Sequence, residues 1–186
     1  MTRRKTAILD YQKAPVLREQ AKRVSLAEIG TKKLGDIIAR MKAALHEQED
    51  GVAIAAPQIG VGLRIFMVSG KAASMYRGKD SKLHTAKGAE PKADTVFINP
   101  EIIKLSKNKK MMEEGCLSVR WQYGEVKRSE KATVRALDER GRKFEVGGSG
   151  LMAQIFQHET DHLDGLLFID KAKNLRELPP THDQSS

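Results

Sequence analysis

Residues 150 to 165, with the sequence GLMAQIFQHETDHLDG, restrict the fold of this chain more than any other segment. Residues four apart on a helix lie about 40° apart around its axis, so His158 and His162 project from one face. Leu151 and Ile155 share that face, which indicates that both histidines lie on the buried side of the helix. Two imidazoles placed in this way can reach one metal ion and shield it from solvent.

This helix is predicted between Ser149, a residue type that caps helix N-termini, and Gly165, a residue type that ends helices. Glu159 lies about 100° from His158 around the axis, at the edge of the same face. Its carboxylate can therefore reach a metal-bound water without being a ligand, which suits a general base. The alternative is a helix that carries two histidines by chance, a known risk for short motifs.

A third ligand decides the class of metal site. The extended metalloprotease pattern requires a histidine six residues after His162, where this chain has Phe168, so that class is disfavoured. Glu177 is the one downstream glutamate, but it lies in a segment interrupted by prolines. Cys116 is the better candidate, because a thiolate and two imidazoles leave a fourth position open for water. The alternative for a lone cysteine is a small buried apolar residue.

Length and composition fit one compact unit. The 186 residues are 40% hydrophobic and 31% charged, and we expect a single domain at 1–175 and a disordered tail at 176–186. No apolar run approaches the roughly 20 residues that span a bilayer, and no apolar stretch follows the basic start. These features predict a cytoplasmic protein without membrane contact, and the single cysteine agrees with a reducing compartment.

Hydrophobic periodicity predicts both helices and strands. Apolar residues at spacings of three and four indicate an amphipathic helix within residues 31–51, and an apolar run indicates a buried strand at 63–68. The lysine-rich segment 70–95 lacks periodicity and is predicted to be an exposed, mobile excursion.

Two later segments predict further strands. Residues 95–105 read as a strand broken by Pro100, because proline removes a donor from the ladder. Residues 131–146 read as a hairpin with its turn near Asp138.

The charge balance favours polyanionic partners. Lys and Arg number 33 against 24 Asp and Glu, a formal net charge of +9, which favours encounters with the ribosome or another polyanion. Aromatic residues make up 5% of the chain and do not alternate with basic residues, so a base-stacking platform is not supported. We expect no sequence-specific nucleic-acid binding. The alternative is a solvated basic surface without a specific partner.

Three segments together resemble the peptide deformylase family: GVAIAAPQ at 51–58, EEGCLSV at 113–119 and QHETDH at 157–162. The similarity covers nearly the whole chain, and the motifs are highly specific as a set. It implies an α+β fold, with small, mostly antiparallel sheets packed around a central metal-binding helix at residues 149–165. It also implies a hydrolase that removes the N-formyl group from the initiator methionine of nascent polypeptides and releases formate.

The resemblance also implies roles for individual residues. Glu159 would be the general acid and base, and the metal would be held by Cys116, His158 and His162. The oxyanion that forms in the reaction needs donors already in place. The resemblance implies that these donors are the side-chain amide of Gln58 and the backbone N–H of Leu117.

Peptide binding is implied at the backbone of Gly51, Val52, Ala53 and Ile54, to which the substrate would add as an extended strand. An apolar pocket for methionine is expected at Val52, Leu151 and Ile155. Glu114 and Arg128 match a pair that the family uses to support the metal site from behind the ligands. The alternative is that these two residues are ordinary surface charges.

The identity of the metal depends on which argument is followed. Ligand type alone favours zinc, whereas the resemblance implies one iron(II) per chain, with zinc, nickel or cobalt able to bind in vitro. Ala53 and Ile54 stand where the family usually has glycine and leucine, which keeps the backbone donors and acceptors. Arg120 and Trp121 stand where a proline commonly follows the second motif, which bears on substrate preference.

Two other functions stay open on the sequence alone. A zinc peptidase could use the same helix, and cleavage between residues without formate release would identify it. A non-catalytic ribosome-associated metal-binding module could carry its function on the basic surface, and it would not depend on Glu159.

Overall fold

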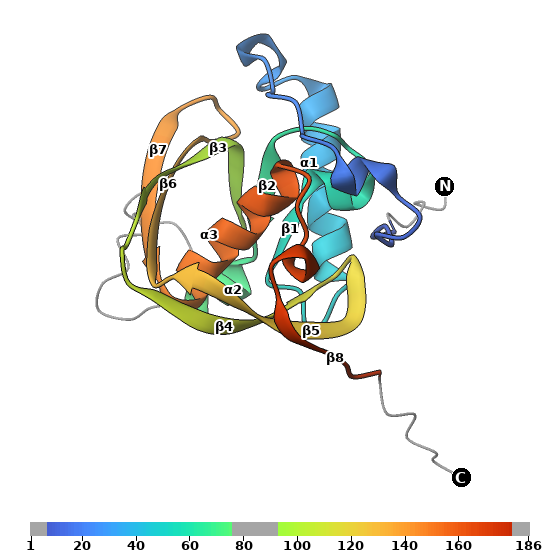
Figure 1. Cartoon of the computed structure of the whole chain (residues 1–186). Helices are drawn as coiled ribbons and strands as arrows, with labels where there is room; N and C mark the ends of the chain where they lie inside the picture. The colour runs from blue at the N-terminus through green and yellow to red at the C-terminus, as the bar shows by residue number, and fades with distance from the viewer. Residues whose placement is uncertain (1–6, 76–92, 180–186) are drawn as a thin grey trace.

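The computed structural model describes residues 7–75 and 93–179 (Figure 1). The five-stranded sheet contains, in spatial order, β1 (Ala53–Ala55), β2 (Ile65–Val68), β3 (Thr95–Leu105), β6 (Lys131–Leu137) and β7 (Lys143–Ser149). The three-stranded sheet contains β4 (Lys109–Cys116), β5 (Val119–Ser129) and β8 (Lys173–Glu177). Every pair of neighbouring strands in these sheets is antiparallel.

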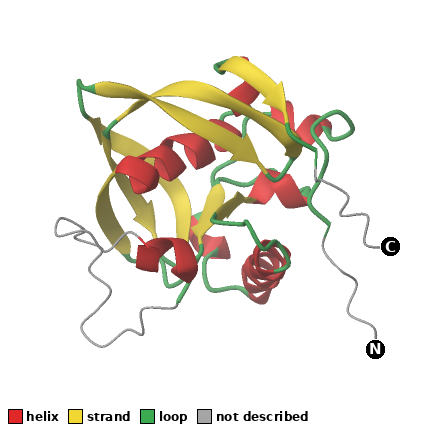
Figure 2. Ribbon diagram, turned by 90° about the horizontal axis from the view of Figure 1, so that it is seen from below, coloured by secondary structure: helices red, strands yellow, loops and turns green. Residues whose placement is uncertain are grey.

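The helices are α1 (Lys32–His46), α2 (Gly70–Met75) and α3 (Gly150–Leu163), with short 3-10 turns η1 (Pro15–Arg18), η2 (Leu26–Glu28), η3 (Ala56–Ile59) and η4 (Phe168–Asp170). α3 lies at the centre of the molecule, and Figure 2 shows the strands arching over it. This is the helix that was predicted from the spacing of its histidines.

The five-stranded sheet is buried on both faces at its centre. Phe66 of β2 belongs to the core shared with α3, while its neighbour Ile65 belongs to the core shared with α1, as the period of two along a strand requires. The rings of Phe66 and Phe97 stack with centroids 4.4 Å apart, and Phe156 of α3 meets Phe97 at 5.6 Å. This packing anchors one face of α3 to the sheet and leaves its other face for β4 and β5.

Three predicted elements are confirmed. The helix expected within residues 31–51 is α1, whose first turn is capped by Thr31, with Oγ1 accepting a hydrogen bond from the backbone N–H of Leu34 at 3.3 Å. The buried strand at 63–68 is β2, and the hairpin at 131–146 is β6 and β7. The hairpin turn is held by Asp138, whose carboxylate accepts hydrogen bonds from the backbone N–H groups of Arg140 and Arg142.

The predicted break at Pro100 is wrong. β3 continues through this residue, with a register shift against β6 between Ile98 and Glu101. Asn99 has a φ of 50° and exchanges two hydrogen bonds of 2.8 Å with the backbone of Val24. The missing N–H of proline is therefore accommodated at a bulge, and the strand resumes after it.

Two boundaries also differ from the prediction. Arg176 and Glu177 lie in β8, where they pair with Tyr123 and Gln122 of β5, because main-chain hydrogen bonds order a segment whose side chains are exposed. The rest of the predicted tail, residues 180–186, lies outside the described residues. Residues 70–75 of the predicted excursion form α2, and residues 76–92 also lie outside the described part.

Gly165, just after α3, gives a test of how the helix end is held. Its φ is 74°, and an added Cβ would lie 2.7 Å from the carbonyl oxygen of Arg18. Gly165→Ala is expected to lower the free energy of unfolding by about 2–5 kcal/mol, the sum of left-handed strain and overpacking. Gly60→Ala is the matched control, because Gly60 has a φ of 79° but its nearest neighbour would be Leu9 Cδ1 at 3.5 Å.

Gly60→Ala should lower the free energy of unfolding by only about 1–2 kcal/mol, which is the cost of a left-handed backbone conformation for alanine. Urea denaturation of both variants measures the difference. Equal losses would contradict a role for the close approach of Arg18.

Candidate functional site

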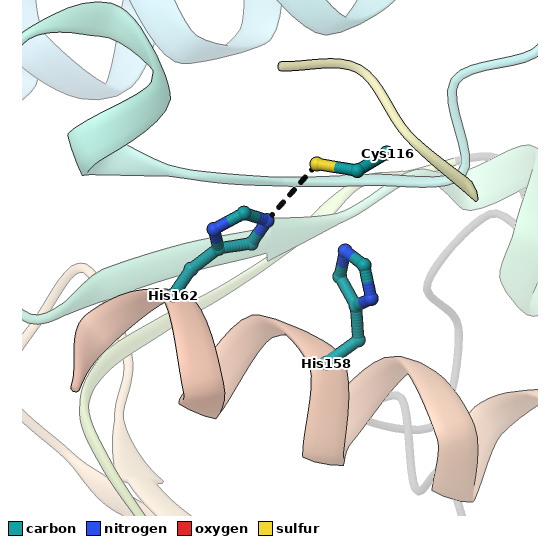
Figure 3. A group of neighbouring side chains, drawn as sticks. All are labelled: Cys116, His158 and His162. Atoms are coloured by element: carbon teal, nitrogen blue, oxygen red, sulfur yellow. Dashed lines mark hydrogen bonds between the residues drawn. The ribbon is translucent and has the colours of Figure 1, made fainter. Parts of the chain in front are cut away.

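Three side chains from two distant segments converge beside α3. Cys116 ends β4, and His158 and His162 project toward it from successive turns of α3 (Figure 3). Their potential ligand atoms all lie within 4.8 Å of one another, and Cys116 Sγ lies 3.2 Å from His162 Nε2. These are the three residues that were predicted as metal ligands.

A buried ion-pair network supports His158 from behind. His158 Nδ1 lies 3.0 Å from Glu114 Oε2, which leaves its Nε2 directed at Cys116 (Figure 3). Arg128 donates to both oxygens of Glu114, at 2.7 and 2.9 Å, and to Asp161 Oδ2 at 2.6 Å. The side chains of Glu114 and Arg128 are 2% and 5% exposed, so the alternative of ordinary surface charges is wrong for this pair.

The network sets the charge state of Glu114. Burial alone would raise the pKa of this carboxyl, but the hydrogen bonds from Arg128 and His158 outweigh it and lower the pKa to about 2. Glu114 is therefore an anion that accepts a hydrogen bond from His158 and fixes the ring orientation, as carboxylates do behind metal-ligating histidines.

The donor set at the cluster fits a transition metal. Burial opposes ionisation of Cys116, but the positive charge of His162 and hydrogen bonds from both histidines hold the pKa of the thiol well below its usual range. A thiolate with two imidazoles is a ligand set of catalytic metal sites that keep one position open. The residues present thus fit a metal cofactor.

Glu159 lies next to this cluster without joining it. It is 4% exposed, and its Oε2 has no hydrogen-bond partner among the described residues. Burial raises the pKa of Glu159, although the charges of His158 and His162 oppose the shift. A carboxyl in this setting can both accept and return a proton.

Gln58 of η3 also lies beside the cluster. Its Oε1 accepts a hydrogen bond from the backbone N–H of Ala55 at 2.8 Å, which fixes the orientation of the amide. Its Nε2 points at Cys116 Sγ, 3.6 Å away, and at Ser118 Oγ, 3.3 Å away. An N–H donor is therefore held beside the three ligands.

A cavity of about 310 Å³ opens onto these groups. Its lining includes all but two of the residues predicted to bind substrate or oxyanion: Val52, Ala53, Gln58, Leu117, Leu151 and Ile155. Gly51 and Ile54 are outside the lining. The side chain of Ile54 packs into the α1 core instead. Leu151 is 40% exposed, so it lies at the open cavity and not in the core as its helix face suggested.

β1 lies at the edge of its sheet. It pairs only with β2 among the strands described, so its other edge has main-chain groups available to an extended peptide. This edge contains Ala53 and Ile54, the two positions that depart from the usual family residues.

Several residues at the site were missed by sequence reasoning. Asp161, inside the histidine motif, is the second carboxylate partner of Arg128, and Gln154 Nε2 donates to the backbone carbonyl of Glu113 at 2.7 Å. Further cavity residues that were not predicted are Asp50, Val119, Gln122 and Tyr123. Of these residues, only Gln154 could have been predicted from the sequence. It lies four residues before His158 and therefore on the same face of α3.

Residues 5–177 match the family model described as polypeptide deformylase. The chain belongs to the peptide deformylase family. Peptide deformylase of Dehalococcoides mccartyi is 38% identical over 170 residues, covering 89% of this chain and 87% of that protein. Peptide deformylase of Halothermothrix orenii is 41% identical over 163 residues, covering 88% and 91%.

Solved deformylase structures share the fold. The Thermotoga maritima enzyme superposes with a TM-score of 0.73 at 32% identity, covering 92% of this chain and 99% of that one. The actinonin-bound class I type b enzyme of Acinetobacter baumannii gives 0.73 at 32% identity, covering 90% and 97%. The predicted α+β class of small antiparallel sheets is confirmed.

As a member of this family, the deformylase removes the N-formyl group from the initiator methionine of nascent polypeptides. The alternatives of a zinc peptidase and of a non-catalytic module are not favoured. Among the described helices, none is long and apolar enough to cross a membrane.

Proposed function

We propose that the deformylase works through a metal held by Cys116, His158 and His162, with Glu159 transferring the proton. The observation that carries this proposal is the convergence of three donor atoms within 4.8 Å beside a buried carboxyl that is not one of them. When bound, a divalent ion supplies Lewis-acid activation of water and of the formyl oxygen.

The chain's own groups account for the remaining steps. Glu159 accepts a proton from the attacking water and later gives it to the leaving amine, which releases formate and a free N-terminus. The Gln58 amide and the backbone N–H of Leu117 donate to the oxygen of the formyl group as it gains negative charge. Glu114 and Arg128 keep His158 in place while this happens.

The proposed substrate binding is supported by the cavity and by the edge of β1 that pairs with no other described strand. The backbone of residues 51–54 would pair with the extended peptide, which recognises main chain with little regard to sequence. The methionine side chain would lie against Val52, Leu151 and Ile155, all of which line the cavity.

The test of this function uses formyl-Met-Ala. Formate and intact Met-Ala are the expected products, and Met-Ala itself should be unchanged by the enzyme. Cleavage between the two residues, or no formate release by metal-loaded protein, would reject the proposal.

Gln58→Ala is expected to lower kcat/KM about a hundredfold or more, because an oriented donor to the oxyanion is lost. Ser118→Ala is the matched control, since it removes a hydrogen-bond partner of Gln58 and keeps the amide. Ser118→Ala should lower kcat/KM much less than Gln58→Ala does. Formate release by both variants at equal metal content measures the effect, and equal losses would contradict the assigned role of Gln58.

We further propose that the resident ion is iron(II). The thiolate and imidazole set accepts zinc, nickel or cobalt as well, so metal analysis must accompany the activity assay. Protein purified without air is expected to be more active with iron(II) than with zinc, and to lose activity in air because a thiolate beside iron(II) is open to oxidation. Full activity of the zinc form, with an iron form no better, would overturn this choice.

The net charge of +9 supports contact with the ribosome, where formylated chains emerge. A cytoplasmic location is proposed because the sequence shows no apolar run long enough to span a bilayer and has a single cysteine. Co-sedimentation with ribosomes should weaken steeply as salt rises. Absence of salt-sensitive binding would reject the contact.

A further inference from the structure

The mouth of the cavity carries an irregular stretch of β5. Cys116 pairs with Val119 and Gly115 pairs with Tyr123, so residues 120–122 of β5 have no counterparts on β4. A bulge of this kind bends the strand and redirects its side chains. Here the bulge lies directly beside Cys116.

Trp121, in the middle of this bulge, has an unusual backbone conformation. Its φ is 66°, which is a genuine outlier for a bulky residue and persists only where the surrounding structure holds it. The backbone N–H of Leu178 donates to the carbonyl of Trp121 at 2.8 Å, and Gln122 pairs with Glu177 of β8. The C-terminal strand therefore holds Trp121 in a conformation that it would otherwise disfavour.

Arg120 connects the bulge to the segment between α1 and β1. Its guanidinium donates to Asp50 Oδ2 at 2.9 Å and to Gln48 Oε1 at 2.5 Å. Its Cζ lies 5.8 Å from the centroid of the Trp121 ring. Because these partners already engage the guanidinium, Arg120 serves to orient the indole and is a poor receptor for a further anion.

The indole remains available to a ligand. Trp121 is 41% exposed and lines the same cavity as His158 and Glu159, together with Arg120 and Tyr123. A peptide paired with the edge of β1 advances by about 3.3 Å per residue and points alternate side chains to opposite sides. If the peptide runs from the metal ligands along β1, the residues that follow the methionine would pass toward Trp121, which lines the same cavity as Val52 and Ala53.

We propose that Arg120 and Trp121 form a binding shelf for an aromatic or large apolar side chain at the second or third residue of the formylated peptide. The shelf would make this deformylase discriminate among nascent chains by the residues after methionine. This inference rests on the proposed function, because it assumes that the peptide runs from the metal ligands along β1. Contact between an aromatic side chain of the peptide and the indole of Trp121 should raise kcat/KM by roughly three- to tenfold.

The test compares kcat/KM for formate release from formyl-Met-Ala-Ser, formyl-Met-Ala-Phe and formyl-Met-Phe-Ser. At least one phenylalanine peptide should exceed the serine peptide by roughly three- to tenfold. That ratio should fall to near one in Trp121→Ala and in Trp121→Gly, and should largely survive in Trp121→Phe. Trp121→Gly is included because glycine adopts a positive φ without strain. A loss of preference in this variant therefore cannot be attributed to a strained backbone. Leu26→Ala, at an exposed residue outside the cavity lining, should keep the ratio.

Fluorescence gives a second measurement, because Trp121 is the sole tryptophan of the chain. The product peptide carrying the preferred phenylalanine, at the concentration that halves formate release, should move the emission to shorter wavelengths, and Met-Ala-Ser should not. Equal kcat/KM for all three peptides, or a phenylalanine preference that persists in both Trp121→Ala and Trp121→Gly, would overturn the shelf. Absence of formate from all three peptides would instead reject the proposed function itself.

Discussion

Glu159→Gln is expected to lower kcat about 10²- to 10⁴-fold while the protein keeps its metal, because proton transfer by a positioned carboxyl contributes that much to rate. The three ligand atoms belong to other residues, and Glu159 Oε2 is buried without a partner in the described part of the chain. Glu159→Ala should behave in the same way. Formate release and metal content, measured on the same samples, check both parts of the prediction.

The stability of Glu159→Gln should not fall with its activity. Glu159→Gln removes a buried charge from a carboxyl whose Oε2 has no hydrogen-bond partner among the described residues, which relieves a desolvation cost, so the melting temperature of this variant should stay level or rise. Glu145→Gln is the control for the substitution, since Glu145 pairs with Arg135 on exposed strands away from the cavity lining. Unchanged turnover in Glu159→Gln would contradict the catalytic role, and loss of metal would make Glu159 a ligand.

Arg128→Met is expected to lower the free energy of unfolding by about 3–5 kcal/mol, because it leaves buried carboxylates without their cation. Glu114 and Asp161 both depend on this guanidinium, and their side chains are 2% and 15% exposed. Arg135→Met removes a partner from an exposed pair of similar length, 2.8 Å to Glu145, and should cost less than about 1 kcal/mol. Urea denaturation of the metal-loaded proteins compares the two.

A double variant identifies the source of that loss. If the cost comes from an unpaired buried charge, Arg128→Met with Glu114→Gln should lose less stability than Arg128→Met alone. Equal losses in Arg128→Met and Arg135→Met would show that burial of the network adds nothing to stability.

Local patterns predicted the elements that depend on local physics. The helical period of 3.6 residues placed His158 and His162 on one face and Glu159 at its edge, and apolar spacing located α1 and β2. The resemblance to deformylases then selected Cys116 over Glu177, a choice that ligand chemistry favoured without excluding the glutamate. Glu177 lies exposed in β8.

The misassigned boundaries have a common physical cause. Pro100 removes one donor, but the strand survives because Asn99 bonds to Val24, which is 75 positions away in the sequence. Arg176 and Glu177 look like tail residues by composition, yet β5 supplies the hydrogen bonds that order them. In both cases a distant segment decided the outcome, and propensity carries no information about that partner.

The sequence by itself determined the chemistry of this protein: a helix with two histidines and a glutamate, a cysteine 42 positions before His158, and a net charge of +9. Tertiary structure alone decided which charges support the site and how its cavity is shaped. Arg128 reaches Glu114 and Asp161 only because β4, β5 and α3 pack together, and Trp121 reaches the cavity mouth only because β8 holds a bulge. The physical reason is that periodicity and ligand chemistry are properties of neighbouring residues, whereas burial, pairing and backbone strain depend on contacts between segments that folding brings together.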